Sequence, residues 1–128
     1  MDLLLDTHVL LWWLTDDSRL QERQRSMLHE PGNRLLVSSV SAFEIATKVR
    51  IGKLPAASTF ERELEQVCTD FGLHELSLSI AHAALAGRLS VDHRDPFDRP
   101  LAAQSIIERV PLMTNDAAFR TFAVDVAW

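Results

Sequence analysis

Four carboxylic acids stand where this sequence is best suited to do chemistry: Asp6, Glu44, Asp98 and Asp116. Asp6 and Asp116 each follow a short apolar run, whereas Glu44 and Asp98 fall in the first turn of an expected helix. Carboxylates gathered in one cleft repel each other unless a cation lies among them, and oxygen ligands suit Mg²⁺ or Mn²⁺. Such a site can activate water and hold a phosphate in line for attack. These residue types therefore indicate metal-assisted chemistry on a phosphate ester.

Helix capping is a competing explanation for each carboxylate taken alone. Asp6 and Asp116 can each cap the helix that follows, and Ser41 and Glu44 have the spacing of a capping box. Considered singly, capping is the favoured interpretation of these residues. Serine, threonine and asparagine would cap equally well, however, and here every one of the positions is acidic. The joint pattern therefore favours a shared site.

The segment from Asp92 to Asp98 holds three acids in seven residues. Asp95 before Pro96 is typical of an N-cap followed by proline at the first helical position. One cap does not require two further carboxylates nearby, so we interpret Asp95 as the cap and Asp98 as the chemical group.

Length and composition predict one globular domain over residues 1–128, with 47% hydrophobic and 24% charged residues. The single cysteine, Cys68, excludes a disulfide framework and a cysteine-based zinc site, and we expect it to be inert in the core. The longest apolar stretch, residues 1–14, contains polar residues and has neither the length of a membrane span nor a basic leader. We therefore expect no membrane association and a cytoplasmic location.

The net charge of −5, from 13 basic and 18 acidic residues, gives no basic footprint for nucleic acid. Leaving out the four acids of the expected site leaves 14 acidic residues against 13 basic ones. Most of the excess negative charge thus belongs to one cleft, and a surface that is otherwise near neutral can still approach a polyanion.

The elements that position these residues alternate between buried strands and helices. This order predicts an α/β fold: a three-layer α/β/α sandwich with a central parallel sheet of four to five strands. The ligand site of such a sheet lies beyond the carboxyl ends of the strands. The expected strands cover residues 3–5, 35–37, 75–78, 112–114 and 123–127. One expected helix follows Asp6 and ends at Leu14. The others cover residues 20–30, 41–50, 60–71, 80–89, 101–110 and 117–119.

Four segments in this order resemble the motifs of PIN-domain ribonucleases, a family that includes the VapC toxins of toxin–antitoxin pairs. The segments are residues 3–12, 38–54, 93–104 and 112–119, and the third is the most specific. The resemblance covers essentially the whole chain. Pro100 departs from the pattern, which more often has an apolar helix former there, so we expect a slightly shifted helix start.

The resemblance implies an Mg²⁺- or Mn²⁺-dependent ribonuclease in which a metal-activated water cleaves an RNA phosphodiester. Asp6 and Asp98 would be the core metal ligands, and Glu44 and Asp116 would complete the catalytic site directly or through water. Thr114 would orient the site or a substrate phosphate.

The resemblance also implies partners: an RNA substrate such as tRNA or rRNA, a cognate antitoxin and a second copy in a homodimer. Arg94 and Arg99 flank Asp98 and are candidates for contacting substrate, and Lys48 is a candidate for a phosphate contact. His8 and His93 lie near the expected cleft, where contact with RNA is a minor alternative to packing.

Two other functions remain open at this point. A phosphatase of the haloacid-dehalogenase type would use Asp6 as nucleophile, but it needs an acid where His8 stands and a later lysine, and none follows Lys53. A non-catalytic binding module with the same fold is the second alternative, and the presence of all four acids argues against it.

Overall fold

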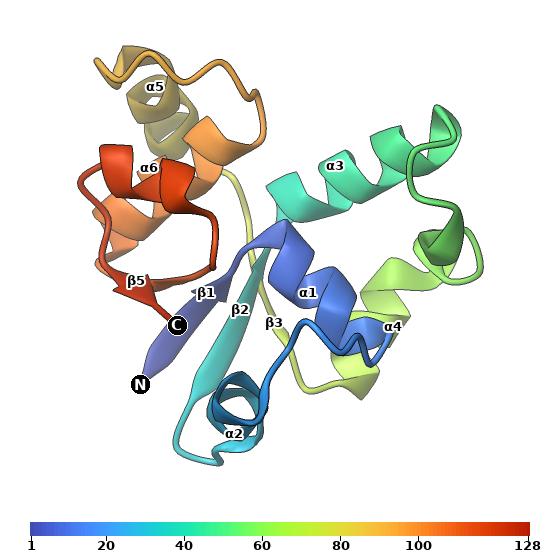
Figure 1. Ribbon diagram of the computed structural model, residues 1–128. Helices are drawn as coiled ribbons and strands as arrows, with labels where there is room; N and C mark the ends of the chain where they lie inside the picture. The colour runs from blue at the N-terminus through green and yellow to red at the C-terminus, as the bar shows by residue number, and fades with distance from the viewer.

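The computed structural model describes residues 1–128 and contains a five-stranded parallel sheet with the strand order β3-β2-β1-β4-β5 (Figure 1). The strands are β1 (Asp2–Leu5), β2 (Arg34–Ser38), β3 (His74–Leu76), β4 (Leu112–Met113) and β5 (Val126–Ala127). The α-helices are α1 (Thr7–Leu14), α2 (Glu22–His29), α3 (Ser39–Arg50), α4 (Leu64–Asp70), α5 (Ile80–Arg88) and α6 (Asp98–Glu108). Three 3₁₀ helices are η1 (Pro55–Ala57), η2 (Glu61–Glu63) and η3 (Ala117–Thr121). The predicted α/β class with a parallel sheet is confirmed.

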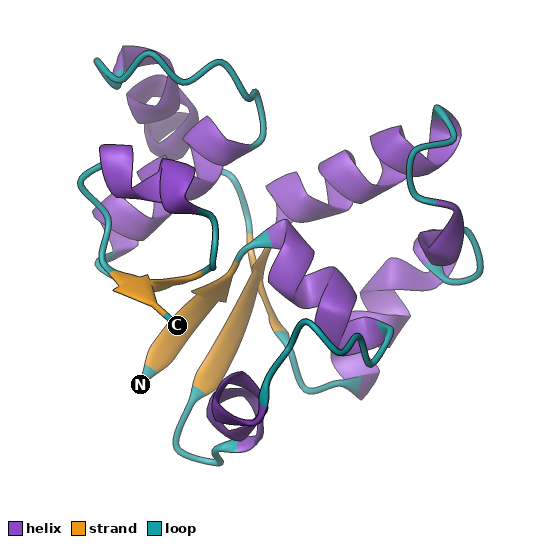
Figure 2. Cartoon of the chain, in the orientation of Figure 1, coloured by secondary structure: helices purple, strands orange, loops and turns teal.

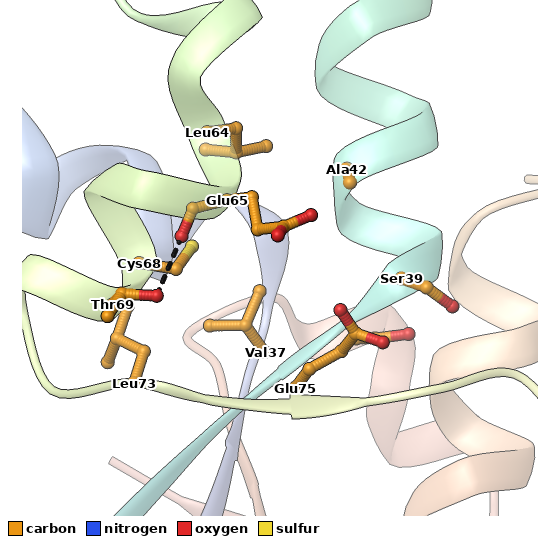
Figure 3. Close-up of a pocket in the computed structure, with 10 residues that line it drawn as sticks. Val37, Ser39, Ala42, Leu64, Glu65, Cys68, Thr69, Leu73 and Glu75 are labelled. Carbon is orange, nitrogen blue, oxygen red and sulfur yellow. Dashed lines mark hydrogen bonds between the residues drawn. The ribbon is translucent and has the colours of Figure 1, made fainter.

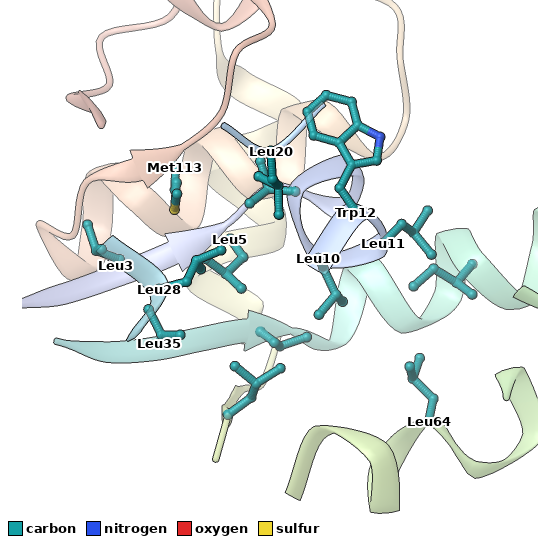
Figure 4. Packing of buried hydrophobic residues seen from close by; sticks show 14 of the residues in the cluster. Leu3, Leu5, Leu10, Leu11, Trp12, Leu20, Leu28, Leu35, Leu64 and Met113 are labelled. Carbon is teal, nitrogen blue, oxygen red and sulfur yellow. The ribbon is translucent and has the colours of Figure 1, made fainter. Parts of the chain in front are cut away.

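Strand β1 is buried on both faces, which explains its uninterrupted leucines. Leu3 and Leu5 point into the larger hydrophobic cluster, whereas Leu4 belongs to the smaller cluster on the opposite face (Figure 4). All three leucines are fully buried. The central position of β1 thus fixes the place where its carboxyl end, and the residue after it, must lie.

Helices cover both faces of the sheet, as Figure 2 shows. The larger cluster joins the sheet to α1, α2, α3 and α4, through residues such as Leu10, Leu28 and Ile45. The smaller cluster joins it to α6 and η3, through Leu101 and Phe119. None of the helices combines the length and the apolar character that a membrane crossing requires.

The chain changes the side of the sheet on which it adds strands between β1 and β4. From β1 the chain proceeds to β2 and β3 on one side, and it then returns to place β4 on the other side of β1. Ligands of open parallel sheets bind outside the carboxyl ends of the strands at such a switch point. The residues that follow β1 and β4 are therefore the ones that the topology brings to the expected ligand position.

Some expected elements differ in extent. The helix predicted over residues 60–71 is divided into η2 and α4, and only Leu64 of its apolar stripe is buried. Little packing therefore holds its first turn in α-helical form. The last strand is confined to Val126–Ala127. Gly52 and Gly72 have φ values of +78° and +72°, which suits their places just after α3 and α4.

Candidate active site

Asp6 follows β1 directly, but its side chain does not cap α1. The carboxylate instead accepts a hydrogen bond of 2.7 Å from the hydroxyl of Thr114, which follows β4. Asp6 is 2% exposed, and this burial raises the pKa of its carboxyl group; the charge of Glu44 raises the pKa further, and the Thr114 hydrogen bond opposes both. The capping interpretation of Asp6 is therefore wrong.

Glu44 lies well inside α3, because the helix begins at Ser39. Ser38 is the cap, and its hydroxyl accepts a 3.0 Å hydrogen bond from the Val40 N–H. The capping box predicted from Ser41 and Glu44 is therefore not formed. The Ser41 hydroxyl is 2.8 Å from that of Thr7, a buried contact that ties α3 to the start of α1.

The Glu44 carboxylate is buried and is paired with the ammonium group of Lys48, one turn further along α3. The negative charge of Glu44 helps to raise the pKa of Asp6. Lys48 therefore compensates the Glu44 charge in this state and is itself partly covered, with 28% of its side chain exposed.

Asp98 is the first residue of α6. The side chain of Asp95 accepts hydrogen bonds from the N–H groups of Phe97 (2.8 Å) and Asp98 (3.0 Å), so the interpretation of Asp95 as a capping residue is confirmed. Oδ2 of Asp98 lies 2.8 Å from Nε2 of His93. Burial raises the pKa of Asp98 to about 6, the charges of Asp95 and Asp6 also raise it, and the hydrogen bond with His93 opposes them.

The helix that carries Asp98 begins three residues earlier than the predicted range of 101–110. Pro100 accordingly falls in its first turn, where the missing N–H removes no intrahelical hydrogen bond. The helix start thus differs from the predicted range, and Asp98 is the first residue of the helix.

Asp116 does act as a cap, because its Oδ1 accepts a 2.9 Å hydrogen bond from the Ala118 N–H at the start of η3. Its own N–H donates to the Thr114 hydroxyl oxygen over 3.0 Å. Thr114 therefore connects Asp116 to Asp6 and joins two of the four acids in one hydrogen-bonded chain.

Arg99 is not free to contact a substrate. Its guanidinium donates four hydrogen bonds of 2.6–3.2 Å to backbone carbonyl groups, that of Ala86 in the last turn of α5 and those of Leu89, Val91 and His93 in the α5–α6 connection. The substrate contact expected of Arg99 is replaced by a structural role, which is to hold the loop that carries His93. Arg94, by contrast, has a side chain that is 93% exposed.

His93 is the site residue that sequence reasoning undervalued. The sequence favours packing for His93, with RNA contact as a minor alternative, yet in the structure it contacts Asp98 directly. The useful signal was its place within the acidic segment 92–98. His8 is exposed, and its charge lowers the pKa of Asp6.

A separate pocket of about 400 Å³ lies between α3, α4 and β3 (Figure 3). None of the four acids lines it. Cys68 does, and burial together with the charge of Glu75 raises the pKa of its thiol. A raised pKa disfavours the reactive thiolate, which agrees with the prediction of an inert cysteine.

The donor set suits a hard divalent cation that keeps part of its water. No three side chains among His, Cys, Asp and Glu are grouped closely enough to enclose an ion. Mg²⁺ ordinarily binds one or two carboxylates and retains several waters, so a closed cage is not required. The buried Asp6 carboxylate has a neutral hydroxyl as its side-chain partner and no ion pair, which leaves its charge available to a cation.

A parallel sheet with acidic residues at the β1–β4 switch point is the architecture of a PIN domain. The sequence model of the PIN domain matches residues 3–125, and the chain belongs to this family.

Among relatives, the chain is 30% identical over 118 residues to Ribonuclease VapC22 of Mycobacterium tuberculosis (strain ATCC 25618 / H37Rv), an alignment that covers 92% of this chain and 89% of that protein. Two solved structures share its fold. One is VapBC2 from Rickettsia felis bound to a DNA fragment from their promoter, with a TM-score of 0.72, 17% identity and coverage of 99% of this chain and 98% of that one. The other is VapBC-1 from nontypeable Haemophilus influenzae, with a TM-score of 0.68, 14% identity and coverage of 99% and 97%.

Proposed function

We propose that this chain, as a single PIN domain over residues 1–128, is a divalent-metal-dependent endoribonuclease that acts as the toxin of a toxin–antitoxin pair. The observation that carries the proposal is the placement of Asp6. Its buried carboxylate is held by Thr114 from the neighbouring strand, caps no helix and lies within electrostatic reach of Glu44 and Asp98. The 30% identity to a protein described as a ribonuclease supports the same activity.

In this proposal Asp6 and Asp98 hold Mg²⁺ or Mn²⁺, and Glu44 and Asp116 complete the site directly or through water. A bound cation of this kind supplies neutralisation of phosphate charge and a more acidic water. The residues of the chain supply orientation: Thr114 fixes the Asp6 carboxylate, and His93 fixes that of Asp98.

Two cations near the acids are available to the RNA backbone. Arg94 is exposed beside the α6 start, and Lys48 is partly exposed beside Glu44. Phosphate contacts from such side chains hold RNA in register without selecting a sequence. We therefore assign substrate binding to Arg94 and Lys48. Thr114, whose hydroxyl donates to Asp6 and accepts from Asp116, orients the site.

The proposed partners follow from the relatives. The VapBC2 and VapBC-1 structures share this fold, which supports our proposal of a cognate antitoxin for this chain. The ribonuclease relative supports an RNA substrate, for which we propose a cytoplasmic tRNA or rRNA. We further propose that the toxin is a homodimer. Light scattering of the purified chain, alone and co-expressed with the protein encoded beside it, tests both associations. A strict monomer that binds no neighbouring gene product contradicts them.

The activity is tested by incubating a mixture of tRNA and rRNA with wild-type protein and with the Asp6→Asn variant, in Mg²⁺ and in EDTA. Asparagine keeps the size and a hydrogen-bonding oxygen but removes the charge. We expect cleavage only by the wild type and only with the metal. Cleavage that survives Asp6→Asn means that another site or a contaminant is responsible. If the wild type neither cleaves RNA nor binds Mn²⁺, the chain is a non-catalytic member of the fold.

A further inference from the structure

Two phenylalanine rings meet beside the acidic site. Phe43 precedes Glu44 in α3, and Phe97 precedes Asp98 at the start of α6. Their ring centroids are 5.6 Å apart and the ring planes are inclined by 82°, an edge-to-face pair. Figure 1 shows α3 and the first turn of α6 facing each other beyond the carboxyl ends of the strands. The pair therefore connects α3 with the residue before α6, one ring coming from each side.

Phe43 is unusually exposed for a large apolar side chain, at 67%. An edge-to-face pair leaves ring faces uncovered, while the contact with Phe97 limits the freedom of the Phe43 ring. The ammonium group of Lys48 lies 5.9 Å from the centroid of the Phe97 ring and also pairs with Glu44. An aromatic ring, a carboxylate of the proposed site and a cation thus follow one another within two turns of α3.

A groove of about 690 Å³ continues from Phe43 along the same face of α3. Phe43, Thr47 and Arg50 line it at helical spacing, so Arg50 is about 10 Å further along the helix axis than Phe43. Arg62 lines the opposite wall, and Glu61 is the acidic lining residue. Neither arginine forms an ion pair in the protein.

We propose that Phe43 is a stacking platform for one unpaired base of an RNA strand, and that the groove with Arg50 and Arg62 binds the phosphates of the neighbouring nucleotides. This inference rests on the proposed ribonuclease function and deepens it by naming the residues that bind an unpaired stretch of the RNA. Exposed aromatic rings next to arginines are the usual means of holding single strands, because every base has a face that can stack. A paired base within an A-form stem has its faces covered and cannot use the platform.

The test measures binding of a short unstructured RNA by fluorescence anisotropy in the Asp6→Asn background, where the strand stays intact. Phe43→Ala is expected to weaken binding by about 5- to 100-fold, and Phe43→Trp to retain it. Phe71→Ala is the matched control, because Phe71 is also exposed, at 44%, but lies away from the site. The same oligonucleotide placed in a stem is expected to bind weakly and to be indifferent to Phe43→Ala.

A second measurement locates the base. Abasic nucleotides are introduced one position at a time around the cleavage site, and cleavage by otherwise wild-type protein is followed. At one position, the abasic nucleotide is expected to reduce cleavage by the protein that has Phe43. The same abasic nucleotide is expected to cause no further reduction in the Phe43→Ala variant. Arg50→Gln and Arg62→Gln are each expected to reduce the salt dependence of binding by about 0.7 in the slope of log K against log salt.

The outcomes separate this inference from the function on which it rests. RNA that is neither cut nor bound by the wild type overturns the ribonuclease proposal itself. Cleavage and binding that are equal in wild type and Phe43→Ala overturn only the stacking platform. A Phe43→Ala variant that keeps its RNA affinity but changes its oligomeric state or its affinity for a partner protein overturns it as well, by assigning the ring to a protein interface.

Discussion

The Thr114 hydroxyl donates a 2.7 Å hydrogen bond to Oδ2 of Asp6, and it joins residues that are 108 positions apart in sequence. Both groups are buried, and the same hydroxyl oxygen accepts the N–H of Asp116. One small side chain therefore fixes the carboxyl ends of β1 and β4 relative to each other.

Replacing Thr114 by valine keeps the shape and removes the hydroxyl. We expect the free energy of unfolding to fall by about 1–3 kcal/mol, because a buried carboxylate loses its donor. Loss of that bond also raises the Asp6 pKa further, so Mn²⁺ should bind more weakly. Urea unfolding and Mn²⁺ titration measure the two effects. Thr114→Ser is the control that retains both, and unchanged Mn²⁺ affinity in the valine variant would contradict the role given to the hydroxyl.

Lys48→Met is expected to lower the Tm of the metal-free protein and to increase the rise in Tm that metal binding produces. The substitution leaves the buried Glu44 carboxylate unpaired, which costs about 1–3 kcal/mol, less than for a fully buried pair because Lys48 is partly exposed. A divalent cation then neutralises more negative charge than in the wild type. Thermal unfolding with and without Mn²⁺ should show a lower starting Tm and a larger upward shift.

The double variant Lys48→Met/Glu44→Gln is the matched control for that experiment. With the charge itself removed, most of the lost metal-free stability should return. Equal metal-induced shifts in Tm for the wild type and Lys48→Met would show that metal binding does not depend on the charge of Glu44.

Metal affinity should fall as the pH is lowered through about 6, the pKa of Asp98. Below that value the carboxyl group is protonated, and a cation must displace the proton. The raised pKa also affects the free energy of unfolding. Because the folded-state pKa exceeds the usual 3.8, the folded protein binds more protons than the unfolded chain between pH 3.8 and about 6. The contribution of Asp98 to stability therefore decreases as the pH rises through that range. Mn²⁺ calorimetry from about pH 7.5 to about pH 5 tests the first statement. Asp98→Asn should bind weakly with little change over that range.

Arg99→Lys is expected to destabilise the loop between α5 and α6 although the charge is kept. Lysine cannot reproduce four hydrogen bonds from a planar guanidinium, and the loss should be at least about 1.5–3 kcal/mol, the contribution of one bond to a charged group. RNA cleavage should fall with it, because the loop positions His93 against Asp98. Arg94→Lys, at an exposed position, should leave stability unchanged; equal unfolding midpoints for the two variants would refute the assignment.

Much of the sheet could be predicted from the sequence because its strands are short apolar runs buried on both faces. Residues 3–5 and 35–37 have no polar alternation, and the strands found there extend them by only one or two residues. The edge elements were less predictable. The expected strand over residues 75–78 lies at residues 74–76, at the edge of the sheet, where its residues are largely exposed and little burial fixes its ends.

Capping residues were the main source of error at the site. Ser38 and Ser41 are chemically equivalent capping residues. The Ser38 hydroxyl accepts the Val40 N–H, whereas the Ser41 hydroxyl is hydrogen-bonded to Thr7 of α1. Asp6 and Asp116 both precede helices, yet only Asp116 caps, because Thr114 engages the Asp6 carboxylate. These outcomes depend on contacts between distant segments, which local spacing does not contain.

The strand order has a consequence for the synthesis of the chain. Asp6 emerges from the ribosome 108 residues before Thr114, its hydrogen-bond partner, which follows the neighbouring strand β4. A partial chain that lacks β4 and the Thr114–Asp116 segment has an unsupported Asp6 and an incomplete set of acids. The ribosome making this chain therefore does not meet the complete set of acids until the Thr114–Asp116 segment has been synthesised.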